Sequence, residues 1–164
     1  MAMLFFTVLF LVTGAATVAS SVGWKGLRDR RARMRVGMTT AFLFTGTDHL
    51  VTPARYIPML PGSVPFPREV VLLTGVCEIA GALGLMTHRW RRLAAMMLAL
   101  YLICETPANV KVAVDGLSVR GMPKTPWFYK GRLCLIPVAI WWAWYSGAVN
   151  DGAVGNKECR TPAG

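Results

Sequence analysis

Charged residues are scarce in this sequence. Asp, Glu, Lys and Arg together make up 16% of the 164 residues, whereas 54% of the residues are hydrophobic. Soluble domains carry about 25% charged residues, so this composition argues against a soluble domain. The sequence instead predicts an integral membrane protein that is all-α, a single polytopic bundle of transmembrane helices surrounded by the lipid bilayer.

Residues that ligate metals are also few. The chain has two histidines and four cysteines, and the cysteines show no CxxC or CxxH spacing. His49 lies at the end of one apolar run and His88 follows another, so they would stand at opposite sides of a hydrocarbon core about 30 Å thick and cannot share one haem. We expect no metal site and no covalently bound cofactor.

No Walker loop, flavin motif or nucleophile–base constellation is recognisable in the chain. Whether the protein is an enzyme therefore stays open at this point.

Acidic residues are too few to balance the basic ones, which leaves a net charge of +10. The cations lie between apolar runs rather than on the face of a soluble scaffold, so we expect no nucleic-acid partner. Six of them fall between Trp24 and Arg35 and three more between His88 and Arg92, whereas seven are spread over the longer opposite connections. The positive-inside rule then predicts an outside N-terminus and a cytoplasmic C-terminus, in a bacterial inner membrane or an organelle membrane.

Five apolar runs predict five spans within a single bundle over residues 1–149. Their expected bounds are about 1–22, 36–51, 69–87, 93–114 and 133–149. The first run is uncharged and long for the apolar part of a signal peptide, so we expect it to be retained. Five prolines between Thr52 and Arg68 predict a stiff extended loop, and residues 150–164 are expected to form a flexible cytoplasmic tail.

Glu78 lies inside the third apolar run. An ionised carboxylate near the middle of a membrane costs roughly 2.5–3.5 kcal/mol, so this side chain should face the bundle. Gly75, Gly81 and Ala82 share its helix face and predict close packing against a neighbouring helix. Glu78 can be a functional group or a structural hydrogen-bonding group, and the sequence does not separate these alternatives.

The fourth run carries Tyr101, Glu105 and Asn109 at i, i+4 spacing. Glu105 and Glu78 lie at similar distances from the short connection at 88–92, so the two carboxyls can share one cavity or make two unrelated hydrogen bonds. His49 falls in the same half of the bundle as Asn109. The candidate ligand-binding residues are therefore His49, Glu78, Tyr101, Glu105 and Asn109.

From Phe42 to Ala113 the sequence resembles the DoxX and DoxX-like family of small membrane proteins. Four groups of residues carry the resemblance: a helix end with Gly46 and His49, a loop with Pro53, Tyr56, Met59 and Pro61, a Gly-x-x-Glu helix with Gly75 and Glu78, and a helix end with Pro107, Ala108 and Asn109. The resemblance implies a four-helix core, to which this chain adds an extra N-terminal helix.

The resemblance also implies a link to quinone-coupled oxidation and to membrane oxidoreductase complexes. We therefore expect a quinone-associated or redox-complex membrane component whose polar cavity holds a quinone. The alternative is a non-catalytic accessory or scaffold subunit that contacts other membrane subunits or further copies of itself. Small-solute transport is less favoured because no inverted repeat is apparent.

Overall fold

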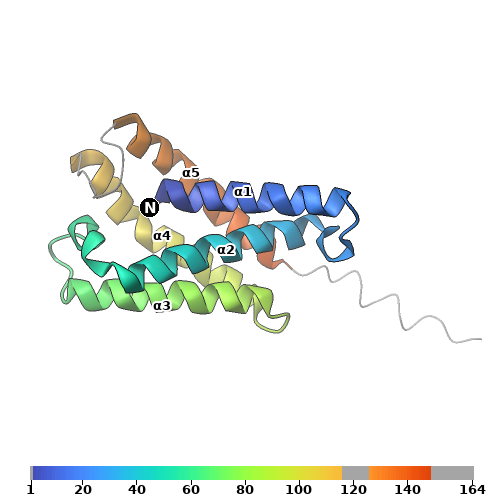
Figure 1. Cartoon of the computed structure of the whole chain (residues 1–164). Helices are drawn as coiled ribbons and strands as arrows, with labels where there is room; N and C mark the ends of the chain where they lie inside the picture. The colour runs from blue at the N-terminus through green and yellow to red at the C-terminus, as the bar shows by residue number, and fades with distance from the viewer. Residues whose placement is uncertain (1, 116–125, 149–164) are drawn as a thin grey trace, which may run out of the picture.

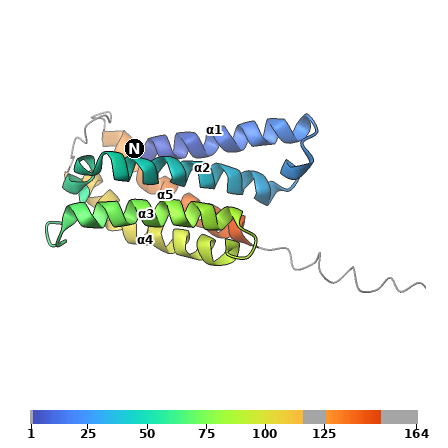
Figure 2. The same ribbon diagram turned by 60° about the horizontal axis from the view of Figure 1, so that its bottom comes forward.

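A computed structural model of the chain describes residues 2–115 and 126–148, and every element in these ranges is helical. The long helices are α1 (Ala2–Ser21), α2 (Arg30–Val51), α3 (Pro67–Met86), α4 (Arg91–Asp115) and α5 (Pro126–Gly147). Consecutive helices run in opposite directions, as the two views in Figures 1 and 2 show. The result is an all-α bundle, as the sequence predicts.

The up-and-down path gives the bundle two chemically different ends (Figure 1). The 22–29 and 87–90 connections and the end of α5 lie at one end, here called the arginine end. The 52–66 connection and the start of α1 lie at the other, here called the proline end. The expected tail at 150–164 lies outside the described residues.

Within residues 2–115 and 126–148, three helices are long and apolar enough to cross a membrane, over Leu4–Ser21, Pro67–Met86 and Arg91–Val114. The apolar part of α5, Leu133–Gly147, is shorter. Large hydrophobic side chains are exposed on these helices, for example Leu73 at 63% and Met96 at 56%. Such an outward apolar surface is what a bilayer requires, and it fits an integral membrane protein.

Helix α2 begins at Arg30, earlier than the apolar run from residue 36 suggests. The Asp29 side chain accepts a hydrogen bond from the Arg31 backbone N–H at 3.1 Å and so caps the helix. The arginines therefore form the first turns of α2 instead of a loop. In the same way α5 begins at Pro126, well before residue 133, because proline suits the first turn of a helix.

The proline-rich connection differs from the extended loop that its composition suggests. It contains two short 3₁₀ helices, η2 (Pro53–Arg55) and η3 (Ile57–Met59), each with a proline in its first turn. At these positions the N–H that proline lacks would have had no helical partner. A third 3₁₀ helix, η1 (Lys25–Leu27), connects α1 to α2.

Arginines of α2 hold the end of α5. The guanidinium of Arg35 donates to the carbonyl of Ser146 at 3.1 Å, and that of Arg31 donates to the carbonyl of Ala148 at 3.4 Å. The last carbonyls of a helix have no partners within the helix and carry partial negative charge, so cations stabilise them. Part of the positive charge at the arginine end is therefore structural.

Helices α2 and α3 approach closely at two glycines. A Cβ added to Gly46 would lie 2.9 Å from the carbonyl oxygen of Gly75, and one added to Gly75 would lie 2.9 Å from the carbonyl oxygen of Gly46. Both distances are to backbone atoms, which cannot move aside as a side chain can. This contact is the small-residue packing typical of membrane helices.

The predicted packing face on α3 serves two neighbours. Gly75 contacts α2, and Ala82 is fully buried, with the Thr39 hydroxyl of α2 donating to its carbonyl at 3.4 Å. Gly81 instead faces α4, where an added Cβ would lie 2.5 Å from Leu98. Helix α1 completes the core with Phe5 and Leu9 buried against Phe42 and Met38 of α2.

Replacing Gly46 by Ala is expected to lower stability by about 1–3 kcal/mol, since the methyl group has to push two backbones apart. The matched control is Gly14→Ala in α1, where an added Cβ would lie in open space and helix propensity favours Ala by about 1 kcal/mol. Thermal unfolding in detergent compares the two variants. A Gly46→Ala protein as stable as the Gly14→Ala protein would contradict the close approach.

Candidate functional site

A buried carboxylate is the centre of the candidate site. Glu78 of α3 is 2% exposed, and helices on both sides of α3 contact its two oxygens. The Tyr101 hydroxyl of α4 donates a short hydrogen bond to Oε1, and Thr45 Oγ1 of α2 lies 2.7 Å from Oε2. Nδ1 of His49, also on α2, lies 3.3 Å from Oε1. A phenol, an alcohol and an imidazole thus surround a carboxylate that is buried from bulk water.

The close approach at Gly46 and Gly75 explains how these groups meet. Thr45 directly precedes Gly46, and His49 is one turn further along the same face of α2. Glu78 holds the corresponding place one turn after Gly75, and an added Cβ at Gly46 would lie 3.1 Å from the Glu78 Cβ. Larger residues at either glycine would separate the carboxylate from its partners on α2.

The Thr45 hydroxyl has more than one acceptor in reach. The Thr45 hydroxyl has a single hydrogen, which can go to Glu78 at 2.7 Å or to the carbonyl of Ala41 at 3.2 Å. His49 Nδ1 is buried and makes no hydrogen bond of regular geometry with the described residues, although it is close to Glu78.

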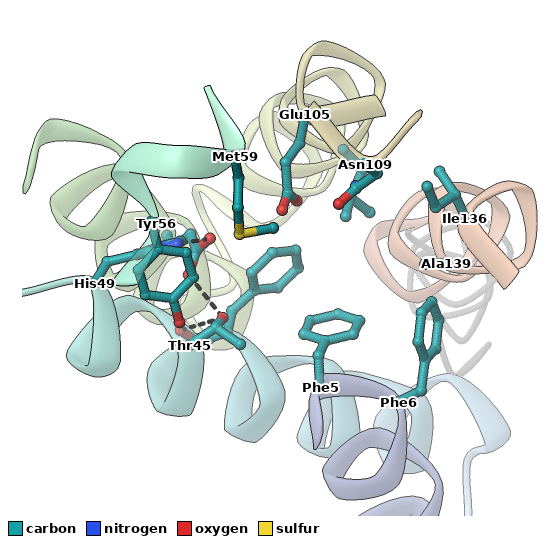
Figure 3. A pocket seen from close by; sticks show the side chains of 13 residues that line it. Phe5, Phe6, Thr45, His49, Tyr56, Met59, Glu105, Asn109, Ile136 and Ala139 are labelled. Carbon is teal, nitrogen blue, oxygen red and sulfur yellow. Dashed lines mark hydrogen bonds and ion pairs between the residues drawn. The ribbon is translucent and has the colours of Figure 1, made fainter. Parts of the chain in front are cut away.

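A cavity of about 40 Å³ lies beside Glu78, between α1, α2, α4, α5 and the η3 segment. Figure 3 shows Glu105 and Asn109 reaching from α4 toward the space between Met59 and the aromatic side chains Phe5 and Phe6. This volume holds a few water molecules but no larger molecule without movement of its walls. Polar groups therefore converge on one small space with a mostly apolar wall.

The structure brings the sequence candidates together. His49, Glu78, Glu105 and Asn109 line this cavity, and Tyr101 holds Glu78 through its hydroxyl. The two carboxyls share one cavity, the first of the two arrangements that the sequence allowed.

Other contributors were not predicted. Thr45 was detectable in principle, because it lies one turn before His49 on α2. Tyr56, Met59, Phe5 and Phe6 also line the cavity, but they come from a connection and from α1, where no periodic pattern indicates which side chains turn inward.

Residues 52–60, which include η2 and η3, cover the cavity at the proline end. This segment is held from two sides. Arg55 donates to both oxygens of Asp48 at 3.1 Å, and the Tyr56 hydroxyl donates to Asp48 at 2.5 Å. On the other side, Lys111 of α4 donates to the carbonyl of Leu60 at 2.6 Å. These bonds fix the segment above the cavity.

Tyr56 connects this cover to the buried centre. Its ring lies against the His49 imidazole, with the two ring centroids 3.9 Å apart. Burial raises the pKa of Tyr56, and the hydrogen bond to Asp48 raises it further, so the phenol stays protonated and remains a donor.

Comparison with known proteins identifies one family. A family model described as Domain of unknown function (DUF8561) matches residues 38–146, about two thirds of the chain. No curated protein and no solved structure matches the chain.

The expected membership of the DoxX family is therefore wrong, because the matching family model is a different one. The residues behind that expectation were glycines at helix contacts, prolines in a connection and a buried Glu. Any small helical membrane bundle can require such residues for packing, so they do not identify a family.

Replacing Glu78 by Leu is expected to cost about 1–3 kcal/mol more than replacing it by Gln, since Leu removes the acceptor that the Tyr101 and Thr45 hydroxyls share. Glutamine keeps an oxygen acceptor of the same shape. Thermal unfolding of both variants in detergent measures the difference. If Glu78→Leu unfolds at the same temperature as Glu78→Gln, the buried centre contributes no net stability.

Proposed function

Because the chain belongs to the family described as Domain of unknown function (DUF8561), its function has to be inferred from the site, and we propose that it binds a small quinone-type molecule. The observation that carries the proposal is Glu78, a buried carboxylate with proton-bearing partners, beside a cavity that Glu105 and Asn109 also line. Polar side chains inside a membrane bundle mark ligand or proton sites by default.

A quinone head matches the chemistry of the cavity walls. It is a flat apolar ring with two hydrogen-bond acceptors, and the cavity offers the Asn109 amide and the His49 imidazole as donors beside the rings of Phe5 and Phe42. Glu78 and Tyr101 can give or take the protons that accompany quinone reduction. The proposal concerns binding and proton exchange, and any source of electrons would lie on a partner.

A quinone ring needs more room than the cavity of about 40 Å³ provides. Met59 is the wall residue best suited to supply it, because methionine is flexible and its segment is attached to α4 through the bond between Lys111 and the Leu60 carbonyl. Release of the Lys111 bonds to the carbonyls of Leu60 and Pro58 would let η3 lift and widen the cavity, while the bonds of Arg55 and Tyr56 to Asp48 keep η2 in place. Entry is therefore expected at the proline end.

An accessory or scaffold role is the alternative proposal. It would use glycine-faced helices and the N-terminal helix as contact surfaces. Gly75 is occupied by α2, and Phe5 and Phe6 of α1 are buried in the core, so these surfaces already serve the bundle itself. Because these surfaces are already in use, we favour the binding proposal. Contact with partner subunits or with further copies of the chain remains a prediction.

We also propose that α2 and α5 cross the membrane, which makes five spans with the arginine end in the cytoplasm. The arginines of α2 would lie at the membrane–water interface. There Arg35 donates to a carbonyl at the end of α5, and the guanidinium of Arg31 lies 5.1 Å from the centre of the Tyr145 ring. Positively charged connections favour the cytoplasmic side.

Cysteine labelling tests this topology in a variant whose native cysteines are replaced by serine. Gly26→Cys and His88→Cys are expected to react from one side of a sealed vesicle, and Ser63→Cys from the other. All three positions lie in connections and are exposed. Reaction of Gly26→Cys and Ser63→Cys from the same side would show that α2 does not cross.

Binding of decyl-benzoquinone to the purified protein tests the ligand proposal. We expect saturable binding that weakens at least tenfold, about 1.4 kcal/mol, in Glu78→Gln, since a neutral amide replaces the carboxylate that orients the His49 imidazole, one of the two proposed donors to the quinone. Glu69→Gln is the matched control, because Glu69 is an exposed residue in the first turn of the same helix. Equal affinities of the two folded variants, or no saturable binding to the wild type, would rule out the proposal.

A further inference from the structure

A long groove runs between α3 and α4 on the outside of the bundle. It measures about 500 Å³ and is lined by Ala80, Gly84, Leu93 and Met97, with Tyr101 at its inner end and Trp90 at its mouth. The groove exists because α3 offers small residues where α4 offers larger ones. It shares no lining residue with the cavity at Glu78, and Tyr101 connects the two because its hydroxyl donates to Glu78.

The length of the groove matches half of a bilayer. On α3 it extends from Cys77 to Thr87, which spans about 15 Å at 1.5 Å per residue. The hydrocarbon core of a membrane is about 30 Å thick, so one leaflet contributes about 15 Å. An acyl chain lying in the groove would therefore reach from the membrane surface to the middle of the bundle.

The mouth of the groove is positively charged. The guanidinium of Arg89 lies 5.7 Å from the centre of the Trp90 ring, and Trp90 itself lines the groove. Arg89 and Arg92 are exposed, and no acidic residue occurs between Glu78 and Glu105. Tryptophan favours the level of lipid headgroups, and arginine pairs with phosphate through two parallel hydrogen bonds.

We propose that this groove is a binding site for one anionic phospholipid of the leaflet at the arginine end. Its acyl chain lies between α3 and α4, and Arg89 and Arg92 hold its phosphate beside Trp90. The occupant follows from an apolar groove one leaflet long whose open end is cationic. The site does not depend on the quinone proposal, because it faces the lipid and lies on the other side of Tyr101.

Native mass spectrometry tests the site on the full chain, released from nanodiscs that contain equal amounts of phosphatidylglycerol and phosphatidylcholine. We expect the wild type to retain one phosphatidylglycerol, with at least a fivefold preference over phosphatidylcholine. Ala80→Trp fills the groove and should abolish retention, whereas Val76→Trp should not. Val76 is a suitable control because it is 53% exposed on the same helix but does not line the groove.

Charge variants test the headgroup contact. Arg89→Gln with Arg92→Gln should remove the preference for phosphatidylglycerol, whereas Arg28→Gln with Arg30→Gln, at the same end but away from the groove, should keep it. Thermal unfolding confirms that each variant is folded, and Ala80→Leu replaces Ala80→Trp if the larger side chain destabilises the bundle.

Three results would overturn the proposal. The first is equal lipid retention by folded Ala80 and Val76 variants, which would show that the groove is empty. The second is an equal loss of the phosphatidylglycerol preference in both double arginine variants, which would show general electrostatic attraction to the membrane and no specific site. The third is a lipid-free dimer, in which a second copy covers the groove.

Discussion

The burial of one carboxylate in an apolar bundle is the constraint on which the rest of this structure depends. Glu78 is almost fully buried, so its hydrogen-bonding partners have to come from other helices. Tyr101 comes from α4, and Thr45 and His49 come from α2, so the carboxylate connects the two helices on either side of α3. The two glycines at the crossing of α2 and α3 bring the backbones close enough for these bonds.

The fold was largely predictable because its main signal is the length of apolar runs. The candidate site was predictable where a polar residue interrupts such a run, as Glu78 and Glu105 do. Helix ends were less predictable: α2 extends to Arg30 because Asp29 caps it, and a hydropathy pattern does not detect a cap. Tyr56 and Met59 were missed because a connection has no periodicity to show which residues turn inward.

The two ends of the bundle use their charges differently. At the arginine end, cations of α2 bind the last carbonyls of α5, and the exposed arginines near Trp90 face outward. At the proline end, Asp48 gathers Arg55 and Tyr56 into a bonded group, and Lys111 binds a backbone carbonyl. Bonds at the proline end hold a cover over the cavity, whereas those at the arginine end join helices.

Tyr101 has two environments at once. Its hydroxyl holds Glu78, while its ring closes the inner end of the groove on the outside of the bundle. A change that displaces the ring also weakens the bond to the carboxylate, and a change at the carboxylate releases the ring. Because such coupling is reciprocal, the packing of the outer groove and the hydrogen bonding of the buried carboxylate are linked through this one side chain.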